Sequence, residues 1–203
     1  MPHELIAGIC RRAIIRRNLI RAVRRAFAPG ASLLHAGCGS GWVDIDLHAD
    51  WRITELDISP GALAFYSRHN PLATGLKHGD IFHLPFEAET FDGIYNLGVM
   101  EHFSPEELAR TLAEFRRVIK PGGKSPAFWP HRFATSGMVL DSAHWILRVC
   151  KRPVVLHPPE ITRFKSRKQI VALLSEAGFA LKSCRFGPRD FFVQVVIVAE
   201  KSP

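Results

Sequence analysis

The chain has few of the residues that build disulfide frameworks or zinc sites. Its 203 residues include four cysteines, Cys10, Cys38, Cys150 and Cys184, and no two of them form a CxxC pair. The ten histidines are dispersed, without an HExxH or comparable pair of metal ligands. We therefore expect reduced thiols in a cytoplasmic protein, and no metal site.

Long hydrophobic runs are absent as well. No run of 18 apolar residues occurs, so we expect no segment that spans a membrane. The N-terminus has no apolar region of the kind that secretion signals carry. Hydrophobic residues make up 47% of the chain, which is enough for one substantial core. We expect residues 1–203 to form one domain.

Charge is unevenly distributed along the chain. Residues 1–28 hold seven arginines and one glutamate, and residues 148–189 hold ten basic and two acidic side chains. The stretch between them is mildly acidic, although the net charge of the whole chain is +8. Two basic ends could attract an anionic substrate, a nucleic acid or a membrane surface. They could equally be a solvated surface, and the sequence leaves both interpretations open.

The first basic end has the periodicity of an amphipathic helix. Over Glu4–Phe27, apolar residues such as Leu19 and Val23 share one face and most arginines lie opposite. Arg12 and Arg16 fall on the apolar side, so they must extend to water or meet an acid. We expect a leading helix packed on a sheet. A helix lying on a lipid surface would have a similar pattern, so peripheral membrane contact stays open.

Segments with strand and helix signals alternate along the rest of the chain. A short helix is expected through Leu47. Further helices are expected from Ser59-Pro60 towards Asn70, from the capping box at Ser104 to Lys120, and from the capping box at Ser166 to Gly178. The expected strands are 32–36, 52–57, a weak one near 76, 91–96, 124–129, 180–186 and 191–200. This alternation predicts a mostly parallel, doubly wound α/β sheet with an antiparallel pair at its C-terminal edge.

The most specific local pattern is LLHAGCGSGW, at residues 33–42. Gly37, Gly39 and Gly41 directly follow a predicted strand, where glycine allows a sharp turn and leaves room for a ligand. Asp57 ends the next predicted strand, 20 residues after Gly37, and this spacing suits a carboxylate that accepts hydrogen bonds from a ribose diol. The pattern predicts a nucleoside-cofactor site at the edge of the sheet.

Four ordered motifs resemble those of class I S-adenosylmethionine-dependent methyltransferases, in the small-molecule group often called type 11. The motifs are LLHAGCGSG, ELDIS, GDIFHLPFEAETFDGIYNLGVMEHF and RVIKPGGK, over roughly residues 32–124. A dinucleotide fingerprint would instead need a glycine where Trp42 stands. The resemblance implies a Rossmann-like seven-stranded sheet with an antiparallel C-terminal strand, S-adenosylmethionine as cofactor, and methyltransferase activity.

The resemblance also implies which residues hold the cofactor. The glycine turn would line its methionine part, Asp57 would hold the ribose hydroxyls, and Asp80 would accept a hydrogen bond from the adenine amino group. Ile58 and Ile81 would cover the two faces of the adenine ring. The implied cofactor-binding residues are His35, Gly37, Cys38, Gly39, Ser40, Asp57, Ile58, Asp80, Ile81, Asn96 and Leu97, with the last two near the sulfonium and methyl group. Alternatively, Asp80 serves only a turn and Asn96 only the end of a strand.

The chain departs from the pattern of this group at His35. Members usually carry Asp or Glu two positions before the first glycine, where the carboxylate helps to hold the amino-acid portion of the cofactor. His35 could form a hydrogen bond in its place, because a neutral imidazole both donates and accepts. Alternatively, it is a core histidine packed beneath the turn. A non-catalytic protein that binds S-adenosylmethionine therefore remains an alternative.

Two residues after the fourth predicted strand are candidates for proton transfer. Methyl transfer from a sulfonium is an in-line displacement, so positioning of the acceptor supplies much of the acceleration. A base is required only when the acceptor carries a proton that must leave. We expect Glu101 and His102 to be the candidates, and His102 is the better one because its ordinary pKa is near neutrality. They could instead only cap the following loop.

The resemblance divides the expected domain into four parts. These are the basic helix 1–28, the cofactor-binding core 29–126, a substrate lid 127–165, and a closing helix and strand pair 166–203. Lid side chains that could enclose a planar or anionic small molecule are Trp129, His131, Arg132, Phe133, Trp145 and His157. The acceptor could undergo O-, N- or C-methylation. An RNA or protein methyltransferase that uses the basic ends is the alternative, although nucleic acid is not favoured because NLGV stands where amine-directed members carry an Asn/Asp-Pro-Pro-Tyr-like motif.

Overall fold

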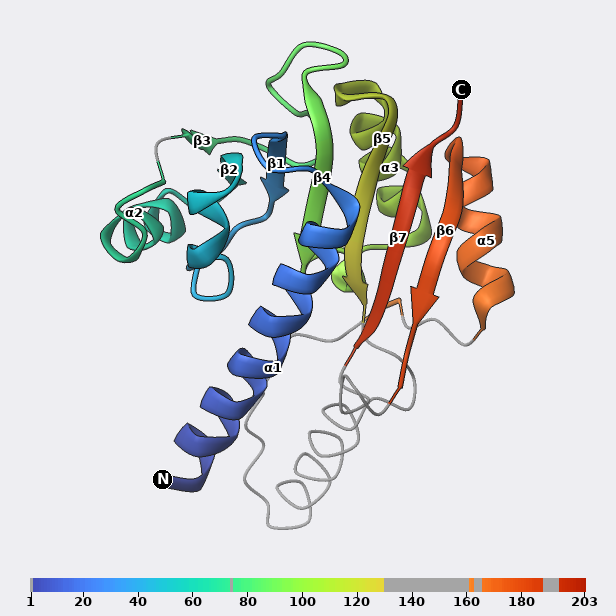
Figure 1. Cartoon of the computed structure of the whole chain (residues 1–203). Coiled ribbons are helices and arrows are strands. Elements are labelled where there is room, and N and C mark those ends of the chain that lie inside the picture. The colour runs from blue at the N-terminus through green and yellow to red at the C-terminus, as the bar shows by residue number, and fades with distance from the viewer. Residues whose placement is uncertain (1, 74, 130–160, 163–165, 188–193) are drawn as a thin grey trace.

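A single seven-stranded sheet organises the protein, in the order β3-β2-β1-β4-β5-β7-β6 (Figure 1). The computed structural model describes residues 2–73, 75–129, 161–162, 166–187 and 194–203, without the side chains of residues 2–12. The strands are β1 (Ser32–Ala36), β2 (Arg52–Asp57), β3 (Gly75–His78), β4 (Phe91–Leu97), β5 (Ile119–Trp129), β6 (Phe179–Arg185) and β7 (Val195–Lys201). The helices are α1 (Pro2–Ala26), α2 (Pro60–His69), α3 (Pro105–Val118) and α5 (Arg167–Glu176), with 3₁₀ turns η1 (Ile45–Ala49) and η2 (Met100–His102).

Strand direction confirms the predicted doubly wound sheet. Strands β1 to β5 are parallel to one another, whereas β7 is antiparallel to both β5 and β6. The strand order runs outward in two directions from the β1–β4 pair. In such sheets, ligands bind at the carboxyl ends of the strands beside this reversal of order. The glycine turn after β1 lies at this place.

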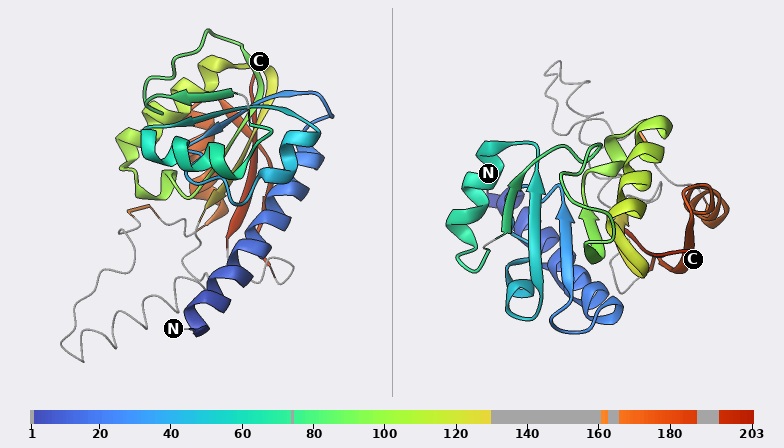
Figure 2. Two further views of the ribbon diagram at one scale, coloured as in Figure 1. Left: turned by 90° about the vertical axis from the view of Figure 1, so that its left-hand side faces the viewer. Right: turned by 90° about the horizontal axis from the view of Figure 1, so that it is seen from above.

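Two apolar clusters cover the two faces of the sheet. Alternate residues of the strands contribute to opposite clusters, so Leu33 packs with α1 whereas Leu34 packs with α3 and α5. Figure 1 shows α1 crossing in front of the sheet and α3 and α5 behind it, and Figure 2 shows the same layers from two further sides. The fold is therefore a three-layer α/β arrangement with α1 as a front layer.

The predicted amphipathic helix is confirmed for the side chains that the structure describes. Leu19 and Val23 are fully buried against the sheet, whereas Arg21 and Arg24 are exposed. Arg16, expected to extend to water or to meet an acid, forms an ion pair with Asp46 at 2.6 Å. No helix in the described part of the chain combines the length and apolar character needed to cross a membrane.

Side-chain caps set the starts of three helices as predicted. The Ser59 hydroxyl accepts from the N–H of Ala62 at 3.2 Å. At α3, Ser104 and Glu107 form the reciprocal capping box, with distances of 3.3 and 2.8 Å. The Ser166 hydroxyl likewise accepts from the third residue of α5, at 3.4 Å. These local signals fix where α2, α3 and α5 begin, and thus place the loops before them.

The boundaries of several elements differ from the prediction. Helix α3 ends at Val118 rather than Lys120, because Ile119 already pairs with β4, and the strand continues through an irregular register at the Pro-Gly-Gly sequence. A 3₁₀ turn from Ile45 to Ala49 replaces the short helix expected through Leu47. Trp129 was expected both at the end of strand 124–129 and in the lid, and the strand prediction is confirmed: Trp129 is a buried residue of β5, opposite Val195 of β7.

Candidate cofactor site

Left-handed backbone at three alternate glycines shapes the turn after β1. The φ angles of Gly37, Gly39 and Gly41 are 76°, 55° and 68°. Gly41 has no space for a Cβ atom, because the ring of Tyr66 lies against it. The N–H of Gly37 donates to the carbonyl of Leu56 at 2.8 Å, which ties the turn to β2. The predicted sharp turn is confirmed, and it requires glycine.

Asp57 joins the glycine turn to the start of α2. Its Oδ2 accepts from the N–H of Gly39 at 2.8 Å, and its Oδ1 accepts from the N–H of Ser59 at 2.9 Å. A carboxylate has about four acceptor positions, so both oxygens retain capacity for further donors. The next residue, Ile58, is 68% exposed. The two residues thus offer a carboxylate and an apolar side chain at the carboxyl end of β2.

Asp80 and Ile81 differ in their surroundings. The Asp80 Oδ1 accepts from the N–H of Phe82 at 2.9 Å, and its Oδ2 lies 3.5 Å from Nδ1 of His83. Asp80 therefore serves a turn, as the alternative interpretation held, while its side chain remains partly exposed. Ile81 is buried in the core cluster behind the sheet. The suggested role of Ile81 against an adenine ring stays a prediction.

Asn96 and Leu97 close the carboxyl end of β4. Asn96 is buried, and its Nδ2 donates to the carbonyl of Ala36 at 2.6 Å, so its amide joins the ends of β4 and β1. Leu97 is half-buried and packs with the front apolar cluster. This geometry matches the strand-end alternative for Asn96, and contact of either residue with a cofactor stays a prediction.

Cys38 and Ser40 alternate with the glycines of the turn. Cys38 is buried, and burial followed by the charges of Glu55 and Asp57 raises the pKa of its thiol well above the ordinary range. The thiol therefore stays protonated and is a poor nucleophile. Ser40 is exposed. Both residues flank Gly39, whose N–H donates to Asp57.

The two candidates for proton transfer lie on η2, just beyond β4. Glu101 is buried and His102 is half-buried. The carbonyl of Glu101 accepts from the N–H groups of Ile161 and Thr162, at 2.8 and 3.0 Å. The indole N–H of Trp129 donates to the carbonyl of Thr162 at 2.9 Å. The segment at 161–162 is therefore attached to η2 and to the end of β5.

Most of the expected lid cannot be compared with the structure. Trp129 belongs to β5, as described above. The other named lid residues, His131, Arg132, Phe133, Trp145 and His157, lie outside the described residues. The lid and its aromatic, cationic character therefore remain predictions.

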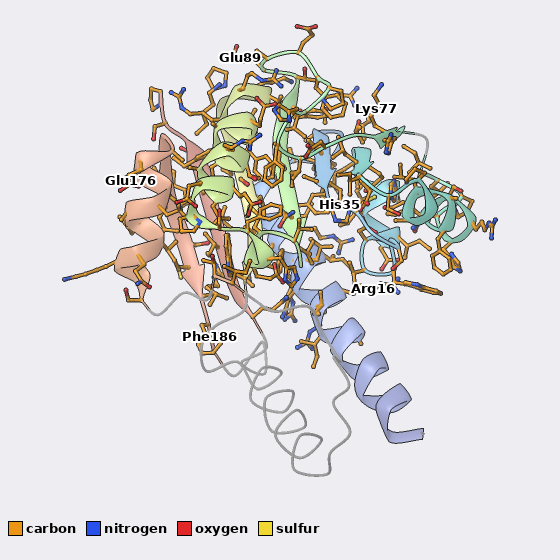
Figure 3. The ribbon with its side chains drawn as sticks, turned by 180° about the vertical axis from the view of Figure 1, so that it is seen from behind. Arg16, His35, Lys77, Glu89, Glu176 and Phe186 are labelled. Carbon is orange, nitrogen blue, oxygen red and sulfur yellow. The ribbon has the colours of Figure 1, made fainter. Side chains whose placement is uncertain are left out.

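A cluster of buried ionisable groups lies beneath the glycine turn, and sequence reasoning missed most of it. His35 on β1, only 1% exposed, has Nδ1 2.6 Å from Oδ2 of Asp44 and 2.9 Å from Oε2 of Glu55. In-register pairing places Glu55 on one side of His35 and Tyr95 on the other, with the His35 and Tyr95 rings stacked at 4.4 Å. Figure 3 shows His35 enclosed within the body of the protein. The core-histidine alternative describes this geometry.

Further side chains complete the cluster. Asp44 Oδ2 accepts from the hydroxyl groups of Tyr66 and Tyr95, at 2.9 and 3.1 Å. His48 Nε2 lies 2.9 Å from the Tyr66 hydroxyl and 3.2 Å from Oε1 of Glu55. These groups come from β1, the turn after it, η1, β2, α2 and β4. We define the buried cluster as His35, Asp44, His48, Glu55, Tyr66 and Tyr95.

Electrostatics within the buried cluster favour a protonated His35. Burial alone would lower its pKa, but the charges and hydrogen bonds of Asp44 and Glu55 outweigh burial and raise it to about 10. For Asp44, burial raises the pKa, whereas the charge of His35 and its hydrogen bonds bring the net shift below the ordinary value. His35 therefore carries a positive charge at neutral pH and compensates buried carboxylate charge.

The same groups are the best candidate metal ligands in the described part of the chain. One ligand atom from each of His35, Asp44 and Glu55 lies within 4.8 Å of the others. A histidine must lose its proton to bind a metal, whereas the raised pKa of His35 favours the protonated form. The expectation that the protein holds no metal stays a prediction.

A sequence signal for the buried cluster did exist. His35 interrupts the apolar run of β1, two residues before Gly37. Glu55 occupies the corresponding position in β2, two residues before Asp57. A parallel register would have placed the imidazole beside the carboxylate. Asp44 and Tyr66 offered no such signal, because they enter the cluster through a turn and a helix.

Comparison with known proteins identifies the domain. Residues 34–125 match the type 11 family described as a methyltransferase domain. The demethylmenaquinone methyltransferase of Symbiobacterium thermophilum is 33% identical over 108 residues, which are 48% of this chain and 42% of that protein. The malonyl-(acyl-carrier protein) O-methyltransferase of Erwinia pyrifoliae is 40% identical over 100 residues, 47% of this chain and 37% of that protein. The chain thus spans about two-fifths of the length of these relatives.

Solved structures show the same fold over nearly the whole chain. Magnesium protoporphyrin IX methyltransferase from Synechocystis, solved with bound S-adenosylhomocysteine, has a TM-score of 0.68 at 18% identity, with 94% of this chain and 83% of that chain covered. A methyltransferase from Methanosarcina mazei has a TM-score of 0.66 at 20% identity, covering 88% and 96%. With the strand order described above, the type 11 match identifies residues 34–125 as a class I S-adenosylmethionine-dependent methyltransferase domain.

Proposed function

We propose that the protein transfers a methyl group from S-adenosylmethionine to a small-molecule acceptor. The observation that carries this proposal is the bridge made by Asp57 between the N–H groups of Gly39 and Ser59. The bridge fixes the glycine turn and the carboxyl end of β2 relative to each other at the switch point of the sheet. A nucleoside that carries an amino-acid tail has two polar parts, and both could be bound at this place.

The residues at this place fit the cofactor chemically. A Cβ atom on Gly39 would meet no neighbouring atom within 4 Å, so the turn has open space beside its backbone. Asp57 retains acceptor positions for ribose hydroxyl groups, and the exposed Ile58 offers an apolar surface for adenine. When bound, S-adenosylmethionine supplies a methyl group activated by the sulfonium.

We propose that the buried cluster supplies the negative charge that an Asp or Glu side chain at the position of His35 would otherwise supply. His35 is enclosed, so we assign it to positioning rather than to contact with the cofactor. Asp44 and Glu55 bring two carboxylates to its single imidazolium. Negative charge thus remains beneath the glycine turn, close to where a cationic sulfonium would lie, even though a histidine occupies the usual acidic position.

His102 is our candidate for accepting a proton from the substrate. It is half-buried on η2, directly after the strand whose carboxyl end meets the switch point. Glu101 is more enclosed, so we place it behind His102 as a second candidate. If the acceptor is a hydroxyl or a protonated amine, His102→Gln is expected to lower kcat about 10²- to 10⁴-fold, with a smaller effect on cofactor affinity. Equal loss of activity and cofactor affinity would contradict the proton-transfer role.

The acceptor is a separate question, because the matched segment is the cofactor-binding part. The relatives named above carry different acceptors in their names, a demethylmenaquinone and a malonyl-(acyl-carrier protein). We therefore propose a screen of planar quinols and anionic carboxylates. Methyl transfer is followed with cofactor labelled in the methyl group, with the parent protein and Asp57→Asn run in parallel.

Each outcome of this screen is informative. Transfer to a small molecule by the parent protein, lost in Asp57→Asn, supports the proposal. Transfer only to RNA or protein would replace it with the alternative class of acceptor. Cofactor binding without transfer to any of these acceptors would favour a non-catalytic protein that binds S-adenosylmethionine.

A further inference from the structure

A groove lined by basic side chains lies between α1 and the antiparallel end of the sheet. Its volume is about 630 Å³. Figure 1 shows α1 crossing in front of the sheet while α5 lies behind β6, so the front of β6 and β7 has no described helix of its own. The basic groove is lined by five cationic residues: Arg21, Arg25, Lys124, Lys182 and Arg185.

The groove unites the two basic ends of the sequence. Arg21 and Arg25 come from the first basic end, and Lys182 and Arg185 come from the second. Lys124 of β5 adds a fifth cation, and its Nζ donates to the carbonyl of Ala26 at 3.1 Å. Residues some 160 positions apart in the chain thus contribute one sign of charge to one concave surface.

Most of this charge has no counter-ion within the described residues. Lys182 pairs with Glu200 at 2.8 Å. No described carboxylate forms an ion pair with Arg21, Arg25 or Arg185, and all three are exposed. Clustered charges of one sign repel one another and oppose folding, so the arrangement suits an anionic ligand better than it suits stability.

The remaining lining residues limit the kind of anion. Its apolar lining residues, including Val196 and Val198, are small, and none of the described residues that line the groove is aromatic. Asn18, with a buried amide oxygen that has no partner, and Ser183 add neutral polar groups. Among the described lining residues, bases would find no aromatic stacking partner, whereas phosphate groups would find arginine donors.

A bilayer surface fits these features less well. Helices that bind membranes combine basic residues with exposed large apolar side chains that enter the lipid. Among the described side chains of α1, none of the large hydrophobic ones is exposed. A concave groove also receives a flexible strand of phosphates more readily than it receives a flat surface.

We propose that the basic groove binds the phosphate backbone of single-stranded RNA, without sequence preference. The arginines of α1 and β6 hold phosphates from two sides, and Lys124 adds a further cation. This binding site is separate from the proposed methyl-transfer site, and it requires no cofactor.

Fluorescence anisotropy with a labelled oligouridylate of about eight nucleotides tests this proposal over a range of salt concentrations. The slope of log affinity against log salt is expected to be about −0.7 for each phosphate contacted. The double variant Arg21→Gln/Arg25→Gln should reduce the steepness of that slope by about 1.4 and weaken binding at low salt at least about tenfold. The matched control, Arg68→Gln/Lys77→Gln, removes the same charge from α2 and β3, at the other end of the sheet, and should leave the slope unchanged.

Three results would overturn the proposal. The first is failure of the folded parent protein to bind the oligonucleotide at low salt. Equal weakening in both double variants is the second, because it would indicate net charge alone. Binding to anionic phosphatidylglycerol vesicles, but not to RNA, that is lost in the groove variant is the third. Thermal melting of all proteins checks that each is folded.

Discussion

The buried cluster and the basic groove use charge in opposite ways. In the buried cluster, each charged group lies within hydrogen-bond distance of an opposite charge or a polar group, and the side chains are almost fully enclosed. In the basic groove, several positive charges share one surface in contact with solvent. Burial makes an unpaired charge costly, whereas solvent tolerates it. The comparison indicates that the buried cluster stabilises the fold and that the basic groove is available to a ligand.

The largest effect is expected from breaking the buried cluster at Asp44. Asp44→Ala leaves the imidazolium of His35 with less compensation and removes the acceptor of two tyrosine hydroxyls. We expect a loss of about 3–5 kcal/mol in the free energy of unfolding, measured by urea denaturation. Asp46→Ala is the matched control, since it breaks an exposed ion pair with Arg16 and should cost at most about 1 kcal/mol. Equal costs would contradict the importance of burial.

A glycine pair tests how firmly the turn rests on the buried cluster. Gly41 and Gly122 have nearly the same φ, 68° and 69°. A Cβ atom on Gly41 would strike the ring of Tyr66, whereas one on Gly122 would meet nothing within 4 Å. Gly122→Ala should cost about 1–2 kcal/mol from backbone strain alone, and Gly41→Ala should cost more and also weaken cofactor binding. Unchanged cofactor affinity in Gly41→Ala would show that cofactor binding at the turn does not depend on its packing against the buried cluster.

The dependence of stability on pH reports the charge of His35. Its pKa is raised from 6.5 to about 10 in the folded protein, so its contribution is complete below about pH 6.5 and is lost as pH rises through about 10. The free energy of unfolding should therefore fall between about pH 7 and pH 10, by an amount on the order of a few kcal/mol. In His35→Gln this fall should be much smaller, whereas His83→Gln, an exposed control, should retain it. A parallel decline in both variants would contradict a buried imidazolium.

The smallest effect on stability is expected in the basic groove. Arg21→Gln/Arg25→Gln removes exposed charge with no described ion-pair partner. We expect the free energy of unfolding to stay within about 0.5 kcal/mol of the parent value, or to rise slightly as repulsion is relieved. Urea denaturation at low salt measures this difference. A loss of several kcal/mol would show that the groove, like the buried cluster, is a structural feature.

Local patterns in the sequence predicted much of the fold. The apolar runs gave β1 and β2 with the observed bounds, and the capping serine at 104 gave the start of α3. The end of α3 was misplaced, because pairing of Ile119 with β4 is a long-range interaction that local helix propensity does not contain. Where competing tertiary contacts were weak, the sequence patterns were reliable guides.

The site was predicted less completely than the fold. The glycine turn and Asp57 are recognisable because each belongs to a motif and the two are separated by a characteristic spacing, and the structure brings them into contact. Asp44 and Tyr66 resemble ordinary polar residues of a loop and a helix, and only the packing of α2 against the turn makes them neighbours. Likewise, the charge counts identified two basic ends, but their meeting in one groove depends on how α1 crosses the sheet.

Calorimetric titration of the protein with S-adenosylmethionine and S-adenosylhomocysteine, beside Asp57→Asn, tests the central claim most directly. We expect saturable binding with one site per chain. Affinity should fall at least about tenfold in the variant, because its amide cannot accept from the N–H groups of Gly39 and Ser59 and from the ribose together. Folded parent protein that binds neither compound would contradict the proposed cofactor site. Equal affinity in parent and variant would contradict the role of Asp57.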